Sequence, residues 1–103
     1  ADPEAWRARG ADLAHFRAPG GESFADVAER ATAVVNRLET DPSAEHVLIC
    51  GHAGVDRALL ARLLGLPLGE LFRFAQPHGA VSRLEFSAGG PRLTLLAGPA
   101  DLP

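Results

Sequence analysis

The chain has a single cysteine, Cys50, and no lysine, methionine or tyrosine among its 103 residues. One cysteine cannot form an internal disulfide, and it does not supply the paired spacing of a zinc site. It therefore favours a reducing compartment. No apolar run reaches the length of a transmembrane helix, and no segment has the pattern of a secretory signal. We expect a cytoplasmic protein that is not held in a membrane.

Neither sign of charge dominates, because 13 acidic residues face 10 basic ones and the formal net charge is −3. This balance gives no reason to expect a nucleic-acid partner. With 47% hydrophobic and 22% charged residues, the composition is that of an ordinary globular protein. The length predicts no more than one domain over residues 1–103. No glycine-rich phosphate loop of the Walker or dinucleotide type is present, which argues against an unrelated nucleotide-binding fragment.

The clearest element is a helix predicted over residues 24–39. Ser23 is a good N-cap, and Asp26 three residues later completes a pattern that resembles a capping box. One face of this helix is apolar at helical spacing. That face comprises Phe24, Val27, Ala28, Ala31, Val34, Val35 and Leu38.

A short apolar run over residues 47–50 predicts a strand buried on both faces, with Cys50 as a core thiol. A second helix is expected over residues 54–64, ended by Gly65, and one more helical turn follows at LGELFRF. AVSRLEF and RLTLLA then predict a hairpin around the turn-rich SAGGP. This order indicates an α/β fold, a sheet covered by helices. Three strands are few for such a sheet, which suggests that others belong to it.

The stretch CGHAG places His52 between the predicted strand and the helix after it. In open α/β sheets, ligands bind beyond the carboxyl ends of the strands. The free N–H groups and the positive dipole end of the following helix attract anions, most commonly phosphate. His52 can donate a hydrogen bond to phosphate oxygens, or it can simply line the turn. Position and spacing alone leave these two interpretations open.

Three segments together resemble the C-terminal half of the histidine phosphatase superfamily, which includes phosphoglycerate mutases, fructose-2,6-bisphosphatase and alpha-ribazole phosphatase-like enzymes. These segments are GGESFADVAERATAVVNRL, HVLICGHAGVDRALLARLLGLP and AVSRLEF. The resemblance covers residues 12–97. Its more specific element is the apolar strand that ends in His52, with Arg57 five residues later. HFRAPGGES is most similar to the small broad-specificity phosphatases of the group that are like alpha-ribazole phosphatase.

This resemblance implies a partial three-layer α/β/α sandwich, the C-terminal half of a phosphoglycerate mutase-like fold. It also implies phosphoryl transfer through a phosphohistidine, on a small phosphorylated metabolite and without metal or cofactor. The family nucleophile is a histidine in an Arg-His-Gly motif, and His52 matches the second histidine, which hydrogen-bonds the transferred group. No Arg-His-Gly occurs in this chain. We therefore expect the chain to be inactive alone and to need a missing N-terminal half or a complementing chain.

Further candidates for the phosphate pocket are less directly indicated. Ala53 and Gly54 begin the helix after His52, and Gln76 and His78 precede a strand at the same expected end of the sheet. Glu22 either points into the pocket or orders its loop by pairing with an arginine.

The other histidines and the arginine of the matched motif receive structural interpretations. Pro77-His78-Gly79 is rejected as a nucleophile motif, because no arginine precedes it and it comes before a strand. Arg57 favours a structural ion pair, and His15 and His46 favour the surface.

A non-catalytic module that binds a phosphorylated ligand or a protein partner is the alternative function. Such a module would be stable and monomeric, whereas an incomplete enzyme would expose a sheet edge and apolar surface, and would associate with itself or with a partner.

Overall fold

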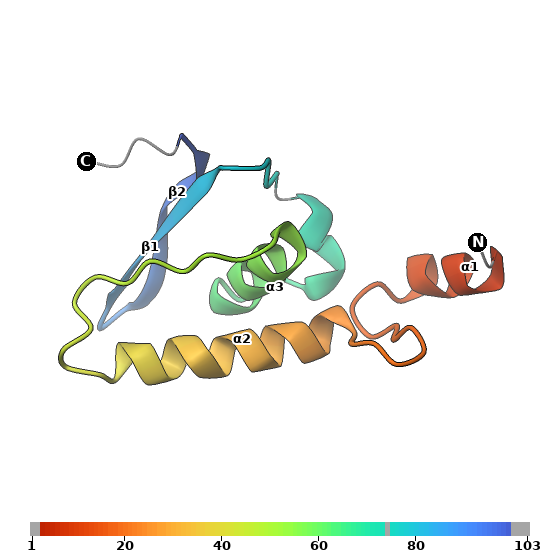
Figure 1. Ribbon diagram of the computed structural model, residues 1–103, viewed down its shortest axis with the longest axis horizontal. Coiled ribbons are helices and arrows are strands. Elements are labelled where there is room, and N and C mark those ends of the chain that lie inside the picture. The colour runs from red at the N-terminus through yellow and green to blue at the C-terminus, as the bar shows by residue number, and fades with distance from the viewer. Residues whose placement is uncertain (1–2, 74, 100–103) are drawn as a thin grey trace.

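The structure, a computed structural model that describes residues 3–73 and 75–99, is a mixed α/β fold (Figure 1). Its elements in chain order are α1 (Pro3–Ala11), α2 (Phe24–Glu39), α3 (Ala53–Leu63), the 3₁₀ helix η1 (Leu68–Arg73), β1 (Val81–Ser87) and β2 (Gly90–Gly98). Within the described ranges, no helix is both long enough and apolar enough to span a bilayer. The expected α/β class is confirmed.

The N-terminus of α2 is fixed by a reciprocal cap, as the sequence predicts. The Ser23 hydroxyl accepts a hydrogen bond from the Asp26 backbone N–H (3.1 Å), and the Asp26 carboxylate accepts one from the Ser23 N–H (2.9 Å). Two of the four N–H groups that a helix start leaves unpaired are thereby satisfied. Arg17, on the preceding loop, donates to the same carboxylate at 2.7–2.9 Å. The loop before α2 is thus tied to the helix start.

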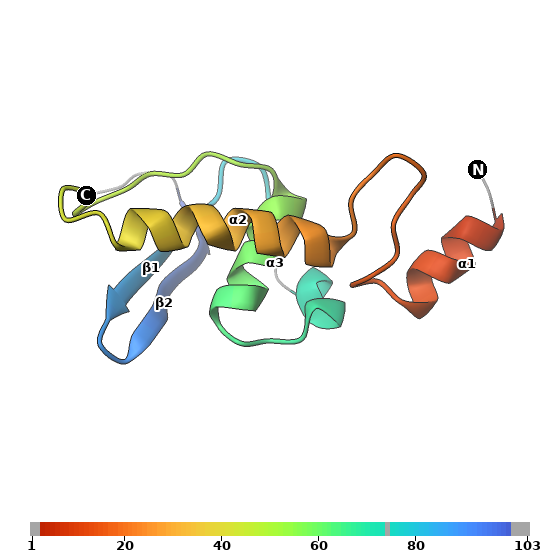
Figure 2. The same cartoon turned by 90° about the horizontal axis from the view of Figure 1, so that it is seen from below.

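The small core lies where α2 packs on α3 and where α3 packs on η1 (Figure 2). Its buried members are mostly small or aliphatic: Ala28, Val35, Ala58, Leu60, Ala61 and Leu71. Leu71 of η1 is fully buried, so the turn predicted at LGELFRF closes one end of the core. Val34 departs from the predicted apolar stripe of α2, because 42% of it is exposed.

The end of α3 is set by Gly65, which has φ +71. The Gly65 N–H donates to the Arg62 carbonyl (3.2 Å), and the Leu66 N–H donates to the Ala61 carbonyl (2.8 Å). These two bonds form a Schellman motif, which requires a left-handed residue just after the helix and therefore favours glycine. The motif turns the chain back toward η1.

The predicted hairpin is present, with β1 and β2 paired antiparallel around Ala88 and Gly89. Ser87 pairs with Gly90 at the turn, and Val81 pairs with Gly98 at the far end. The register shifts on both sides of Arg83, so the ladder is irregular at the end closer to the loop that precedes β1.

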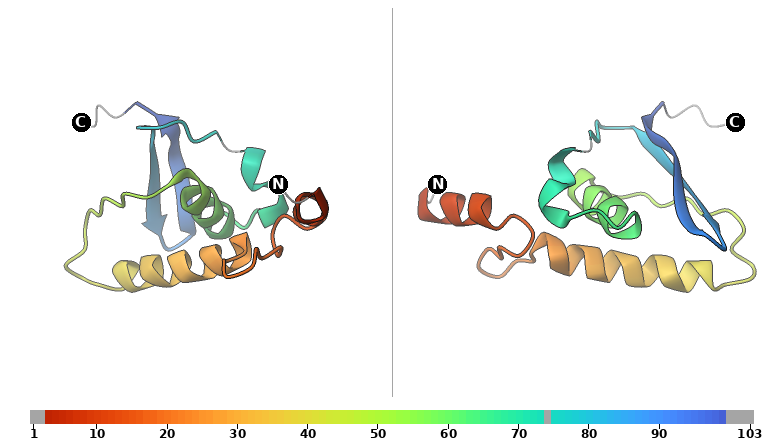
Figure 3. Two further views of the ribbon diagram at one scale, coloured as in Figure 1. Left: turned by 45° about the vertical axis from the view of Figure 1, so that its right-hand side comes forward. Right: turned by 180° about the vertical axis from the view of Figure 1, so that it is seen from behind.

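The predicted buried strand over residues 47–50 is wrong for this structure. The segment between α2 and α3 has no strand pairing, and Val47, Leu48 and Ile49 are 50%, 73% and 52% exposed (Figures 1 and 3). Cys50 is likewise exposed instead of being a core thiol. The physical reason is that a strand buried on both faces needs neighbouring strands and a covering layer. Within the described chain, the only sheet is the two-stranded hairpin, and its ladder does not extend to this segment.

Candidate functional site

A pocket of about 320 Å³ lies at the N-terminal end of α3. One wall is the start of the helix, with Gly51, His52, Ala53 and Asp56. The other wall is the loop that leads into β1, residues 76–80. The structure therefore brings together four of the six predicted site residues: His52, Ala53, Gln76 and His78.

His52 is the N-cap residue of α3, with extended backbone angles (φ −107, ψ 157). Its carbonyl accepts the first helical bond, from the Asp56 N–H at 2.9 Å. Its imidazole makes no capping hydrogen bond to the helix, and the residue is exposed. The ring is consequently available to a ligand, beside the first-turn N–H groups and the positive end of the helix dipole.

His78 is presented by a tight turn. The Ala80 N–H donates to the Pro77 carbonyl at 3.1 Å, and Gly79 adopts φ +75. A turn with a positive φ at its third residue favours glycine there, which accounts physically for the His-Gly pair. The exposed His78 side chain then contributes to the pocket wall opposite α3.

Gln76 is tied to the hairpin beneath the pocket. Its amide Nε2 donates to the Ser82 hydroxyl at 3.3 Å, and the same hydroxyl accepts a bond from the Ala97 N–H at 3.1 Å. Ala97 has φ 51, a conformation that L-residues with a side chain adopt only under constraint. Ser82 thus fixes both the irregular end of the hairpin and the amide of Gln76.

Asp56 is the pocket residue that sequence reasoning missed. It lies one helical turn after His52, and its Oδ1 would be only 2.7 Å from a Cβ atom placed on Gly51. Gly51 therefore makes room for this carboxylate. Burial raises the pKa of the Asp56 carboxyl, and the charge of His52 acts in the opposite direction. The i, i+4 spacing from His52 is the signal that could have found it.

The ionisable residues that line the pocket are His52, His78 and Asp56, and among the described residues no arginine lines it. The described lining of this pocket therefore includes no guanidinium group to pair with an anion. The first-turn N–H groups at the start of α3 are further donors at this wall of the pocket.

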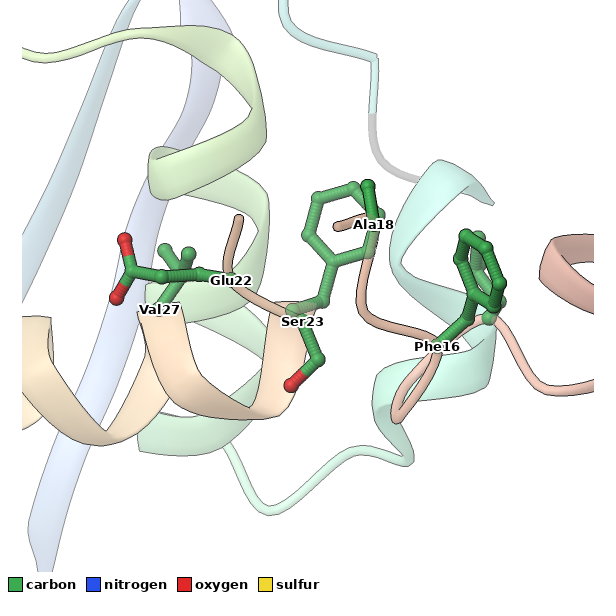
Figure 4. A pocket seen from close by; sticks show the side chains of 7 residues that line it. Phe16, Ala18, Glu22, Ser23 and Val27 are labelled. Carbon is green, nitrogen blue, oxygen red and sulfur yellow. The ribbon is translucent and has the colours of Figure 1, made fainter. Parts of the chain in front are cut away.

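Two predicted site residues lie outside this pocket. A Cβ atom on Gly54 would be 3.5 Å from Cε1 of Phe24, so Gly54 faces the α2 start. Glu22 lines a second pocket, of about 190 Å³, and its carboxylate accepts hydrogen bonds from Arg30 at 3.1 and 3.2 Å. In Figure 4, that carboxylate points away from Phe16. Glu22 therefore pairs with an arginine, as one of its two interpretations expected.

Arg57 follows Asp56 on α3 and packs on an aromatic ring. Its guanidinium carbon is 5.3 Å from the centroid of the Phe72 ring, which meets Phe24 edge to face at 5.8 Å. The cation–π contact joins α3 to η1, and the ring contact joins η1 to the start of α2. The contact gives Arg57 a place in the packing of the three elements.

The structure thus defines the protein as one of mixed α/β class, with a histidine-lined pocket at the N-terminal end of a helix. Comparison with known families makes this specific: residues 1–98 match the model described as histidine phosphatase superfamily (branch 1). The chain belongs to the histidine phosphatase superfamily.

Individual relatives are similar to this chain over part of their own length. An acid phosphatase of Mycobacterium tuberculosis is 36% identical over 78 residues, which are 76% of this chain and 38% of that protein. An adenosylcobalamin/alpha-ribazole phosphatase of Salmonella typhimurium is 30% identical over 92% of this chain and 47% of its own. The crystal structure of an alpha-ribazole phosphatase from Shigella flexneri superposes with a TM-score of 0.76 at 27% identity, covering 92% of this chain and 47% of that one. The chain thus spans less than half the length of each.

Proposed function

We propose that the protein is a phosphomonoester hydrolase or phosphomutase that acts through a phosphohistidine. In this proposal the chain supplies the second phosphate-binding histidine, His52, and the nucleophilic histidine comes from the part of the protein that corresponds to the rest of the relatives. Membership of the superfamily and the phosphatase names of the relatives support the reaction class. The observation that carries the assignment of His52 is its uncommitted imidazole in a pocket at the start of α3.

The chemistry fits what phosphoryl transfer demands. Catalysis of this reaction depends on positioning the group and on stabilising negative charge that spreads over its oxygens. His52 and the first-turn N–H groups of α3 donate to those oxygens from one side. Ala53 contributes a backbone N–H, and Gln76 and His78 line the opposite wall. Glu22 and Gly54 stand outside the pocket and have no part in this proposal.

The composition of the pocket also supports the proposal that another segment completes the phosphate site. The described lining of the pocket has two histidines, one carboxylate and no arginine. The histidines can donate hydrogen bonds to a phosphate group, but no arginine of the described lining pairs with its negative charge. The Arg-His-Gly motif of the family nucleophile is also absent from the chain. The substrate class is a small phosphorylated metabolite, and the partner is the missing N-terminal half or a complementing chain.

The first experiment measures hydrolysis of 4-nitrophenyl phosphate by the 103-residue chain alone. We expect no turnover above that of a His52→Ala chain, because an electrostatic helper without a nucleophile cannot form a phosphoenzyme. Clear turnover that His52→Ala abolishes would refute the claim that another segment supplies the nucleophile.

The second experiment introduces His52→Ala into the complete protein. Loss of one donor to the developing charge predicts a fall in kcat of at least about a hundredfold. The matched control is His46→Ala, which removes an exposed histidine that does not line the pocket. If the two variants retain equal activity, His52 has no role in the reaction, and a non-catalytic binding module becomes the better account of this half.

A further inference from the structure

We propose that Asp56 makes the His52 pocket selective for the monoanionic form of a phosphate group over the dianionic form, an inference that rests on the proposed role of His52. The carboxylate lies inside the pocket that would receive the phosphate, and the catalytic proposal does not use it. It is a specificity-determining group, since it acts through its charge on the bound anion.

The position of Asp56 follows from the helix start. His52 is the N-cap of α3, and Asp56 stands four residues later, so its side chain returns over the first turn. Its Oδ1 occupies the space that a side chain at Gly51 would need, 2.7 Å from the site of that Cβ atom. Both residues line the pocket together with His52. A carboxylate therefore stands beside the N–H groups that attract an anion.

The other ionisable groups at the pocket are the two histidines. His52 stands on the same helix start, and His78 comes from the loop that packs opposite. Arg57 is the next residue along α3, and its guanidinium lies over the ring of Phe72. Burial raises the pKa of the Asp56 carboxyl, because this half-buried group loses part of its hydration. No arginine among the described lining residues neutralises this carboxylate from within the pocket.

A fixed negative charge repels a dianion twice as strongly as a monoanion at the same distance. Phosphate monoesters lose their second proton near pH 6, so both forms are present close to neutral pH. The pocket should therefore hold a monoester more tightly on the acidic side of that titration. Protonation of Asp56, whose pKa is raised by burial, would also favour anion binding as the pH falls, because it removes a negative charge from the pocket.

The test separates the charge of the anion from the pH. Sulfate is a dianion and methyl sulfate a monoanion throughout the range, so both are measured at pH 7.5 and low salt with the wild-type chain and the near-isosteric Asp56→Asn. Nuclear magnetic resonance titration, following the amide signals of Gly51 and Ala53, gives the Kd of each anion. Asp56→Asn should tighten sulfate binding about five- to tenfold and methyl sulfate binding about two- to threefold. Both gains should shrink as salt is raised.

Glu45→Gln is the matched control, because it removes one negative charge from an exposed residue that does not line the pocket. It should change neither Kd appreciably. An unchanged or weakened sulfate affinity in Asp56→Asn overturns the inference, and so does an equal gain for the two anions. His52→Ala should weaken both anions in either background. The two failures can be told apart. If His52→Ala changes neither Kd, or if no anion binds near α3, the proposed role of His52 fails together with the inference. If His52→Ala weakens binding but Asp56→Asn does not give the expected gains, only the inference about Asp56 fails.

Discussion

At the scale of single residues, Asp26 is the carboxylate with the densest set of donors in the described chain. It accepts hydrogen bonds from the Ser23 N–H and from the guanidinium of Arg17. The Ser23 bond, followed by the Arg17 bond, holds the pKa of the Asp26 carboxyl below its usual value of 3.8. The charged form is thus favoured in the folded chain, and the link between the loop and α2 is strongest while Asp26 is ionised.

Substituting Asp26→Asn should lower stability at pH 7 and leave it nearly unchanged in strong acid. The folded-state pKa lies below the unfolded value of 3.8, so the stabilisation is present above that value and is lost as pH falls through the folded pKa. Urea unfolding of both chains between pH 2 and pH 7 measures the difference. The control Glu29→Gln, an exposed change on the same helix, should show no such convergence. A gap that stays constant down to pH 2 would contradict the linkage.

The residues that could be predicted are those whose signal is local. Ser23 and Asp26 form a pattern within four positions, and His52 stands at a recognisable junction. Asp56 was missed because a carboxylate on a helix is most often a solvated group. The i, i+4 spacing from His52 indicates that the two residues share one side of the helix start, and the structure then shows the Asp56 carboxylate beside Gly51 in the pocket. Glu22 had two open interpretations, and the reach of Arg30 from the next helical turns decides between them.

At the scale of elements, the turn after α3 depends on the backbone of one residue. Gly65 at φ +71 carries the Schellman bonds that direct the chain toward η1 and the buried Leu71. Alanine at that position would have to adopt the left-handed region. Gly69, in contrast, has open space around its Cα atom and no positive φ.

Gly65→Ala should therefore destabilise the chain by about 1 kcal/mol, the usual penalty for a left-handed residue with a side chain. In a domain of this size that corresponds to a fall in Tm of roughly 4–8 °C. Thermal unfolding followed by circular dichroism measures it. Gly69→Ala, which meets no steric obstacle, serves as the control and should stay within about 0.5 kcal/mol of the wild type. Equal Tm values for the two variants would show that the helix end tolerates another geometry.

Helices and the hairpin could be predicted at this scale because their patterns lie within one stretch of chain. The capping box, the apolar stripe and Gly65 marked α2 and α3, and turn residues marked the hairpin. The strand over residues 47–50 failed for the opposite reason. Its apolar sequence describes what the segment tends to bury, whereas a strand also requires a hydrogen-bonded neighbour. The described chain provides none for it.

At the scale of the whole molecule, the feature that bears on assembly is the exposed apolar segment between α2 and α3. The principal extents of 46 × 27 × 23 Å describe an elongated body, with α1 set apart from the α2–α3 core (Figure 3). Val47, Leu48 and Ile49 together form an exposed apolar segment directly before the His52 pocket. The part of each relative that this chain matches is only 38% of one protein and 47% of the other, so both relatives are more than twice as long as the matched part. We therefore expect this segment to be covered in the complete assembly.

The wild-type 103-residue chain should accordingly associate in a concentration-dependent way, because exposed apolar residues on an extended, unpaired segment favour pairing with another chain. Size-exclusion chromatography with light scattering over a hundredfold concentration range measures the mass. Leu48→Gln should shift the population toward monomer, since Leu48 is 73% exposed and its loss removes nothing from the core. Val34→Gln makes a similar apolar-to-polar change at a residue of α2 that is 42% exposed, and it should leave association unchanged. A wild-type chain that stays monomeric at every concentration would favour the self-sufficient binding module over the incomplete enzyme.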